Sequence, residues 1–253
     1  MSWREFWKAV EKADVVVEVL DARDPPSFRL EKVEEKIKES KGLVLAINKI
    51  DLVPQRVYVG RTKRFEMQGY LSAYVSATKR LGTRILRVVI KKAAPRKDPI
   101  YVAVVGYPNV GKSTIINILR GRHGAATGSI PGITRRSQEY RIGGNIRVLD
   151  TPGVYPVESL EDMVYKGSIR PEELEDPITA AVLLIRKLRE LDPKVLEKHY
   201  GVDDEDEEKA LEKIALRRGL LLKGGKPNVE EAARIIIRDW QKAKIRVRRN
   251  PPV

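Results

Sequence analysis

One short stretch, residues 106–114, constrains this chain more than any other, because it reads Gly-Tyr-Pro-Asn-Val-Gly-Lys-Ser-Thr. An apolar run at residues 101–105 precedes it, and a second at residues 115–119 follows it. This order predicts a strand, a glycine-bounded loop and a helix, the setting that a phosphate-binding P-loop requires. The backbone N–H groups of such a loop point at phosphate oxygens, assisted by the positive end of the following helix.

Polar side chains of this loop have separate expected roles. Lys112 would reach the β- and γ-phosphates of a nucleotide, and the Ser113 hydroxyl would coordinate Mg²⁺. The pattern by itself also fits a glycine-rich turn followed by a helix with a solvated lysine, so the neighbouring motifs have to decide. The residues expected to contact the nucleotide here are Tyr107, Pro108, Asn109, Val110, Gly111, Lys112, Ser113 and Thr114.

A second motif indicates which base would be bound. An apolar run at residues 43–47 leads into Asn-Lys-Ile-Asp, which ends at Asp51. In guanine-nucleotide proteins this aspartate accepts both the N1–H and the exocyclic amine of guanine, and adenine offers neither donor there, so the carboxylate would reject it. Asn48 would brace the loop, and the stem of Lys49 would lie along the base. Without the P-loop, a polar turn after a strand would explain the tetrapeptide equally well.

A third motif follows one strand–helix unit later. Residues 71–75 form a short apolar strand pattern, and Ser76 and Ala77 stand at its end. This pair would offer backbone and hydroxyl contacts to the guanine O6. The dipeptide is uninformative alone, and only its position after the Asn-Lys-Ile-Asp motif makes it a candidate.

Residues after the P-loop supply the expected γ-phosphate sensors. Thr134, in a Pro-Gly-Ile-Thr sequence, would close over the γ-phosphate and complete the Mg²⁺ shell, as switch loops do. Asp150 would hold Mg²⁺ through water, and the Gly153 N–H would sense the γ-phosphate. Lys112, Thr134 and Gly153 form the expected catalytic set. An isolated loop threonine is more often a plain turn residue.

Charge and composition narrow the partners. The formal net charge is +14 and the isoelectric point is near 9.8, which favours a polyanionic partner, nucleic acid first. A solvated basic surface is the alternative. The chain has no cysteine, which excludes disulfides and cysteine-bearing metal sites. No apolar run approaches the roughly 20 residues that a membrane span needs, and the first residues do not resemble a secretory signal, so we expect a cytoplasmic protein without a membrane partner.

The pattern changes character near residue 155. Residues 1–155 alternate strand and helix patterns, which predicts an α/β domain with a doubly wound, mostly parallel sheet of about six strands. Residues 156–253 carry helical periodicity only and end in a basic tail, which predicts a small all-helical, RNA-binding domain. Asn228 and Glu231 have capping-box spacing before the last helix, and the basic tail is expected to be disordered, RNA-binding or merely solvated. The other helices are expected at residues 158–168, 178–190, 193–200 and 205–222.

The order of the motifs is rotated. In Ras-like GTPases the P-loop comes first and the guanine-reading Asn-Lys-x-Asp comes late, whereas here the guanine motifs precede the P-loop. Moving the termini to an exposed loop preserves the core of a fold. The whole chain therefore resembles the circularly permuted GTPases, with a P-loop GTPase-type sheet.

Within that group the chain is most similar to the YlqF/RbgA-like ribosome-assembly GTPases. Asp-Ala-Arg-Asp-Pro at residues 21–25 resembles the early signature of that family, and residues 131–134, 150–153 and 224–228 are also similar to it. The resemblance implies GTP and GDP binding, slow GTP hydrolysis and a role in maturing the large ribosomal subunit. The implied partners are the large subunit or its precursor and rRNA, with a monomer expected away from the ribosome.

The resemblance leaves the water activator undetermined. Val154 stands where Ras-type enzymes carry a water-orienting glutamine, so the isolated enzyme should be slow. Asn109 occupies the position at which potassium-dependent GTPases ligate K⁺, which would supply positive charge. The family is associated with a histidine near the N-terminus, but this chain has only His123 and His199.

Two other functions stay open. A GTP-binding RNA scaffold would bind GTP with little turnover, and a GTPase acting in tRNA modification or translation would contact a different RNA. The mechanical prediction is that a shift at Gly153 is passed directly to the helical domain, so that GTP orients it to grip rRNA and hydrolysis releases it.

Overall fold

The computed structural model describes residues 3–120, 138–142, 145–151 and 159–247 of the 253. Contacts within the chain divide it into two compact units, Met1–Tyr155 and Pro156–Val253. Among the described residues, no helix is long and apolar enough to cross a membrane.

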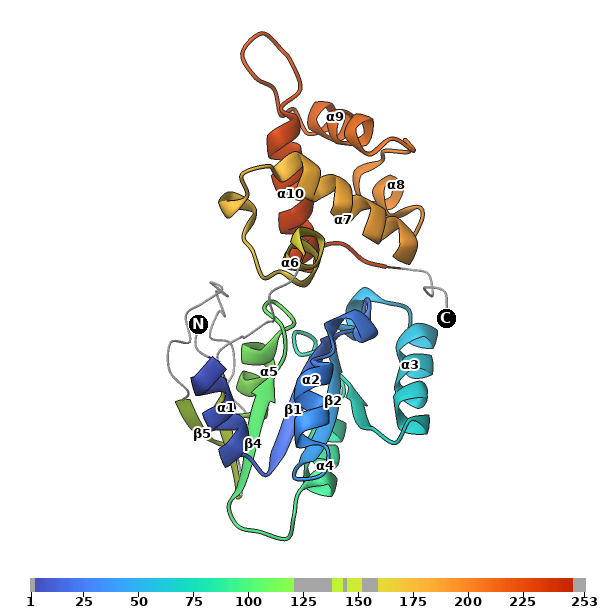
Figure 1. The fold of residues 1–253 in the computed structure, drawn as a ribbon. Helices are drawn as coiled ribbons and strands as arrows, with labels where there is room; N and C mark the ends of the chain where they lie inside the picture. The colour runs from blue at the N-terminus through green and yellow to red at the C-terminus, as the bar shows by residue number, and fades with distance from the viewer. Residues whose placement is uncertain (1–2, 121–137, 143–144, 152–158, 248–253) are drawn as a thin grey trace. The chain divides into compact units, whose positions relative to one another are not determined.

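The first unit is built on a six-stranded sheet in the order β3-β2-β1-β4-β6-β5 (Figure 1). All neighbouring pairs are parallel except β5 and β6, which are antiparallel. The predicted doubly wound, mostly parallel sheet is therefore confirmed. The strands are β1 (Val15–Asp21), β2 (Gly42–Asn48), β3 (Leu71–Tyr74), β4 (Ile100–Val105), β5 (Gln138–Ile142) and β6 (Ile146–Asp150).

The central strands are continuous apolar runs because both faces of the sheet are covered. Every residue of β1 is buried, and so are the last five residues of β2. Glu18, in the middle of β1, is a carboxylic acid among these apolar residues, and it is only 1% exposed. Its side chain therefore needs hydrogen-bond partners within the protein interior.

Helices cover both faces of this sheet (Figure 1). On one face α1 contacts α2, where Lys36 Nζ lies 4.2 Å from the centre of the Trp7 ring. On the other face α4 contacts α5, where Arg87 Nη2 donates to the carbonyls of Ile118 and Leu119. The helices of this unit are α1 (Trp3–Lys12), α2 (Glu31–Ile37), α3 (Gln55–Met67), α4 (Thr83–Ala93) and α5 (Lys112–Leu119), with 3-10 turns η1 (Pro25–Phe28) and η2 (Ile50–Leu52).

The strand order reverses direction between β1 and β4. The chain after β1 continues to β2 and β3 on one side, while the chain after β4 continues to β5 and β6 on the other. In open α/β sheets, ligands bind outside the carboxyl ends of the strands at such a switch point. Here those ends carry Asp21 and, after Val105, the P-loop.

The second unit is helical, as expected, with α10 packed against α6, α7 and α9. Trp240 anchors it: the indole stacks on Tyr165 with ring centres 5.2 Å apart, and its Nε1–H donates to the Tyr165 carbonyl at 2.7 Å. Its elements are α6 (Leu160–Lys166), η3 (Pro171–Glu173), α7 (Pro177–Leu191), α8 (Val195–Tyr200), α9 (Glu207–Arg217) and α10 (Val229–Gln241).

Two local expectations about the helices of this unit differ from the structure. The helix expected to reach residue 222 ends at Arg217, because Gly219 has φ +66° and Leu221 pairs with Pro227. The Asn228 side chain accepts from the Glu231 N–H, but the Asn228 N–H donates to the Leu220 carbonyl, so the capping box is only half made.

The basic tail is ordered as far as it is described. Ile245 and Val247 are each 1% exposed, so alternate residues of this stretch are buried. The backbone of Arg246 hydrogen-bonds to His199 Nε2, which fixes the tail to α8. The expectation of disorder is therefore wrong up to residue 247, because the apolar residues of the tail find a packed position.

Candidate nucleotide-binding site

The P-loop connects β4 to α5 with a strongly curved backbone. Gly106, Asn109 and Gly111 have φ of +137°, +59° and +102°. Positive φ values at three positions curve the backbone of this loop tightly, and concave loops of this kind present N–H groups to anions. Gly111 is also the N-cap of α5, so the positive end of that helix closes the concave side.

The Lys112 side chain folds back over its own loop. Its ammonium donates to the Gly106 carbonyl at 2.8 Å and to the Tyr107 carbonyl at 2.6 Å. Tyr107 itself is buried and meets Phe28 edge-on, with ring centres 6.1 Å apart. Packing therefore holds the loop while Lys112 places a positive charge over it.

Asn48 ties the P-loop to the loops expected to read the base. Its side chain is 2% exposed; Nδ2 donates to the Val110 carbonyl at 2.8 Å, and Oδ1 accepts from the Ala77 N–H at 3.1 Å. Only glycine fits at position 111, because a Cβ atom there would lie 2.3 Å from Asn48 Nδ2. One buried amide thus joins three segments that are far apart in the sequence.

The residues expected to recognise guanine lie together. Asp51 is in η2, and its Oδ1 accepts from the Ser76 hydroxyl at 2.6 Å. Ser76 is completely buried and also accepts from the Lys79 N–H. Lys49 is the N-cap of η2 with φ +66°, an uncommon conformation for lysine that turns the chain toward Asp51.

Three residues that the motifs did not single out for the site belong to its frame. Asp21 and Arg23 form a buried ion pair that also engages Lys49. Thr151, 1% exposed, donates from Oγ1 to the Val104 carbonyl at 2.6 Å and holds the end of β6 against β4. The signal for Asp21 was available, since it stands at the carboxyl end of a strand beside β2.

The electrostatics of this frame are set by burial and pairing. Burial alone would raise the pKa of Asp21, but the charges and hydrogen bonds of Arg23 and Lys49 outweigh it and hold that pKa well below its usual range. Burial lowers the pKa of the Lys49 ammonium, against the opposing attraction of Asp21. The carboxylate is thus the group that keeps two buried cations in place.

Several of the expected residues lie outside the described part of the chain. Thr134, Gly153, Val154 and His123 are not among the described residues, and only the backbone of Asp150 is described, at the end of β6. Ser113 is exposed in the first turn of α5. Among the described residues, no group of three His, Asp or Glu side chains could hold a metal ion.

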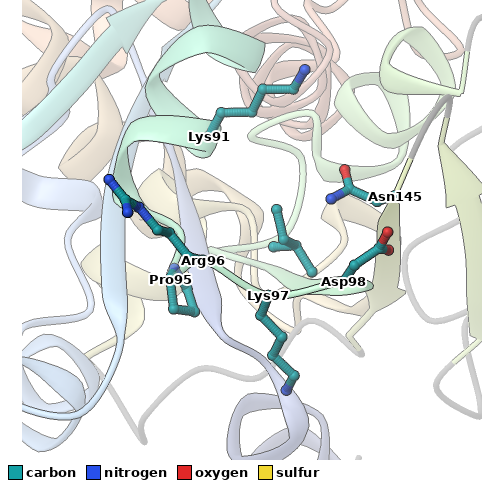
Figure 2. Close-up of a pocket in the computed structure, with 7 residues that line it drawn as sticks. Lys91, Pro95, Arg96, Lys97, Asp98 and Asn145 are labelled. Carbon is teal, nitrogen blue, oxygen red and sulfur yellow. The ribbon is translucent and has the colours of Figure 1, made fainter.

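A hollow of about 550 Å³ lies beside Ile100 at the amino end of β4, whereas the P-loop follows the carboxyl end of this strand (Figure 2). In the figure the long side chains of Arg96 and Lys97 point in different directions, and Lys97 Nζ is paired with Asp14 at 3.0 Å. No set of polar groups converges there, so this hollow does not compete with the P-loop edge. It is lined by Lys91, Pro95, Arg96, Lys97, Asp98, Ile100 and Asn145.

The fold and these loops define a P-loop GTPase domain whose motifs occur in rotated order. Residues 101–217 match the family described as 50S ribosome-binding GTPase. The chain is 24% identical to YlqF in its GDP-bound structure, with a TM-score of 0.73 over 98% of this chain and 99% of that one. GNP-bound YlqF from T. maritima is 23% identical, with a TM-score of 0.71 over 99% and 98%.

Curated relatives are similar along nearly the whole chain. An uncharacterized GTP-binding protein of Methanocaldococcus jannaschii is 40% identical over 94% of this chain, which spans 64% of that relative. Nuclear/nucleolar GTPase 2 of Arabidopsis thaliana is 36% identical over 96% of this chain, which spans 43% of it. The chain therefore has the fold of YlqF and is similar along nearly its whole length to GTP-binding proteins, in agreement with its motif order.

Proposed function

We propose that this chain binds GTP, hydrolyses it to GDP and phosphate, and acts in large ribosomal subunit assembly through rRNA. The observation that carries the proposal is Asn48, which joins the P-loop at Val110 to the base-reading loop at Ala77. A phosphate cradle and a guanine reader are useful together only if one nucleotide spans both. The family description and the names of the relatives support the ribosomal part.

At the base end, Asp51 is the selective group. Its carboxylate accepts from N1–H and from the exocyclic amine of guanine, and the Ser76 hydroxyl donates to Oδ1 and fixes its rotamer. Adenine would leave this carboxylate without donors, which costs more than a weak mismatch in an apolar pocket. The Ala77 N–H already donates to Asn48 Oδ1, so in this structure it holds Asn48 rather than facing the guanine O6.

At the phosphate end, the curved loop and Lys112 would bind the β- and γ-phosphates. In hydrolysis, water adds to the γ-phosphorus and the bond to the β–γ bridging oxygen breaks, which releases GDP and phosphate. Ser113, Thr134 and Asp150 would hold Mg²⁺, and Asn109 would hold K⁺. Bound cations of this kind neutralise charge that develops on the phosphate oxygens.

The RNA contact would involve the second unit. Two arginines of α10 are already paired within this unit: Arg234 with Glu230, and Arg238 with Glu172. In contrast, Lys223 and Lys226 are exposed in the loop between α9 and α10, next to glycines with open space around them. We therefore assign the main phosphate contacts to this loop, because exposed cations supply most of the affinity for RNA backbones.

The test is GTP turnover in K⁺ or in Na⁺, each with and without purified large subunits. Stimulation by large subunits supports the assembly function, and faster turnover in K⁺ supports the role of Asn109. Tight GTP binding without turnover under any condition would instead favour an RNA scaffold. Crosslinking of Lys223 and Lys226 to tRNA rather than rRNA would favour a GTPase of tRNA modification or translation.

The base specificity has its own test. Asp51→Asn offers an amide donor where guanine has an amine, so it should lose GTP and gain xanthosine triphosphate, whose C2 carbonyl accepts that donor. We expect the preference to invert by at least about tenfold, the value of one hydrogen bond of this kind. An unchanged preference for guanine would mean that Asp51 does not read the base.

A further inference from the structure

The Asp-Ala-Arg-Asp-Pro signature contributes Asp21 and Arg23 to the frame of the site, and it contacts the loop that carries Lys49 and Asp51. Asp21 is the last residue of β1 and lies beside Asn48, the last residue of β2, in the parallel register. The Ala22 N–H donates to the Asn48 carbonyl at 2.8 Å. The signature therefore continues the sheet pairing into the loop that carries Lys49 and Asp51.

The Asp21 carboxylate is saturated by this cluster. Oδ1 accepts from the backbone N–H and from Nε of Arg23, both at 3.0 Å. Oδ2 accepts from Arg23 Nη2 and from Lys49 Nζ, both at 2.8 Å. Arg23 thus binds both carboxylate oxygens as a planar bidentate pair, and Lys49 shares Oδ2 with it.

Burial makes this geometry hard to change. The side chains of Asp21 and Arg23 are 1% and 2% exposed, and that of Lys49 is 14% exposed. A buried charge that loses its partner is far more costly than a surface pair. Lys49 is also held in a left-handed conformation, and such strain persists only where surrounding contacts enforce it.

We propose that Asp21, fixed by Arg23, is a positioning residue for guanine recognition: it anchors the Lys49 ammonium and so sets the turn that presents Asp51. With the ammonium anchored, the methylene stem of Lys49 forms a flat support for the base. The inference rests on the proposed function, since it concerns how the same site selects guanine.

The experiment compares GTP with inosine triphosphate, which lacks the exocyclic amine of guanine. The ratio of their dissociation constants isolates the second hydrogen bond to Asp51. In Asp21→Asn the turn loses its anchor, so GTP should bind about tenfold more weakly and the GTP preference over inosine triphosphate should fall several-fold. The rate of hydrolysis at saturating GTP should stay within twofold of the wild-type value, because the phosphate end is untouched.

A double-mutant cycle separates positioning from plain stabilisation. Lys49→Met should lower the preference as Asp21→Asn does, and the double variant, which removes one anion and one cation together, should be no worse than Lys49→Met. Additive losses in the double variant would overturn the proposal. If Asp21→Asn does not fold, Arg23→Lys keeps the charge but loses the fork, and its preference should fall by an intermediate amount; an unchanged preference there would also overturn it.

Glu18→Gln is the matched control, because Glu18 is an equally buried carboxylic acid on the same strand. Its partners are the Leu30 N–H and the Glu34 side chain, and not Lys49. This variant should leave the nucleotide preference unchanged, and a fall equal to that of Asp21→Asn would contradict the proposal. The xanthine test of Asp51→Asn is independent of this cycle. If Asp51→Asn inverts the preference from GTP to xanthosine triphosphate but Asp21→Asn has no effect, only the positioning role of Asp21 is contradicted. If Asp51→Asn does not invert the preference, the guanine site itself is contradicted.

Discussion

The two ends of the candidate site differ in how their polar groups are satisfied. At the base end, Asp51 receives the Ser76 hydroxyl and Lys49 is held by Asp21. At the phosphate end, the Lys112 ammonium donates to carbonyls of its own loop, at Gly106 and Tyr107. The base reader is a frame of buried side-chain bonds, whereas the charge at the phosphate end is bonded to backbone atoms.

This difference assigns distinct tasks to the two ends. Side chains that are already fixed before the nucleotide arrives lose little conformational freedom on binding, which favours selective binding of the base. These side chains contact the base and not the phosphates, so their effect on affinity should not depend on the number of phosphates. A lysine that shares its protons with loop carbonyls can redistribute them when phosphates arrive. We therefore expect substitutions at the base end to affect GTP and GDP equally, and those at the phosphate end to dominate affinity.

The largest effect is expected for Lys112→Ala. Loss of the charge over the P-loop should weaken GTP binding by about a hundredfold or more, since a charge-assisted contact to phosphate has no neutral replacement. Titration with a fluorescent GTP analogue measures this, and Lys91→Ala in the far hollow is the control, expected to bind like the wild type. If Lys112→Ala bound GTP with wild-type affinity, the P-loop would not be the phosphate-binding part of the site.

Asn48→Ala tests the connection between the two ends. It removes the bonds to Val110 and Ala77 and leaves a buried carbonyl and a buried N–H without these partners. We expect a loss of about 2 kcal/mol in unfolding free energy and about tenfold weaker binding of GTP and GDP alike. Denaturant titration and calorimetry measure the two effects. A loss confined to GTP would mean that Asn48 acts only at the γ-phosphate side.

Ser76→Ala should have a smaller effect, limited to the base end. Without the hydroxyl, Asp51 loses the bond that fixes its rotamer, and the Lys79 N–H loses an acceptor. Guanine nucleotides should bind about fivefold more weakly, the equivalent of about 1 kcal/mol. The ratio of GTP to GDP affinity, measured by calorimetry, should not change. A changed ratio would show that the two ends are not independent.

The smallest effect on binding is expected for Glu18→Gln, in the middle of β1. Burial, reinforced by the nearby charge of Glu34, raises the pKa of Glu18 well above its usual range. A raised native pKa means that the native state keeps this proton up to a higher pH than the unfolded chain does. The stability that this gives is complete below about pH 4.3, the usual value for glutamate, and is lost as pH rises toward the raised value.

Glutamine imitates the protonated acid at every pH. The variant should therefore match the wild type near pH 5 and exceed it near pH 8, by about 1 kcal/mol or more in unfolding free energy. Urea denaturation at both values checks this. A difference that shrinks as pH rises would contradict the sign and, with it, the contrast between Glu18 and the ionised Asp21.

Short-range pattern predicted much of the fold and the positions of the motifs. The parallel strands were recognisable because a sheet covered on both faces requires continuous apolar runs, such as residues 15–20 and 43–47. The P-loop was recognisable because glycine at positions such as 111 is required by a left-handed backbone, a constraint that the local sequence itself expresses. Together these patterns also predicted the rotated order of the GTPase family.

Partner choice between distant side chains was decided only by the tertiary structure. Lys49 pairs with Asp21 across 28 positions, Asn48 reaches Val110 across 62, and Thr151 reaches Val104 across 47. Each contact depends on which strands are neighbours and in what register, and residue spacing carries neither. The sequence by itself determined which chemical groups stand at the carboxyl edge of the sheet; strand order and register decided which of them meet, because long-range contacts form only when the whole sheet is assembled.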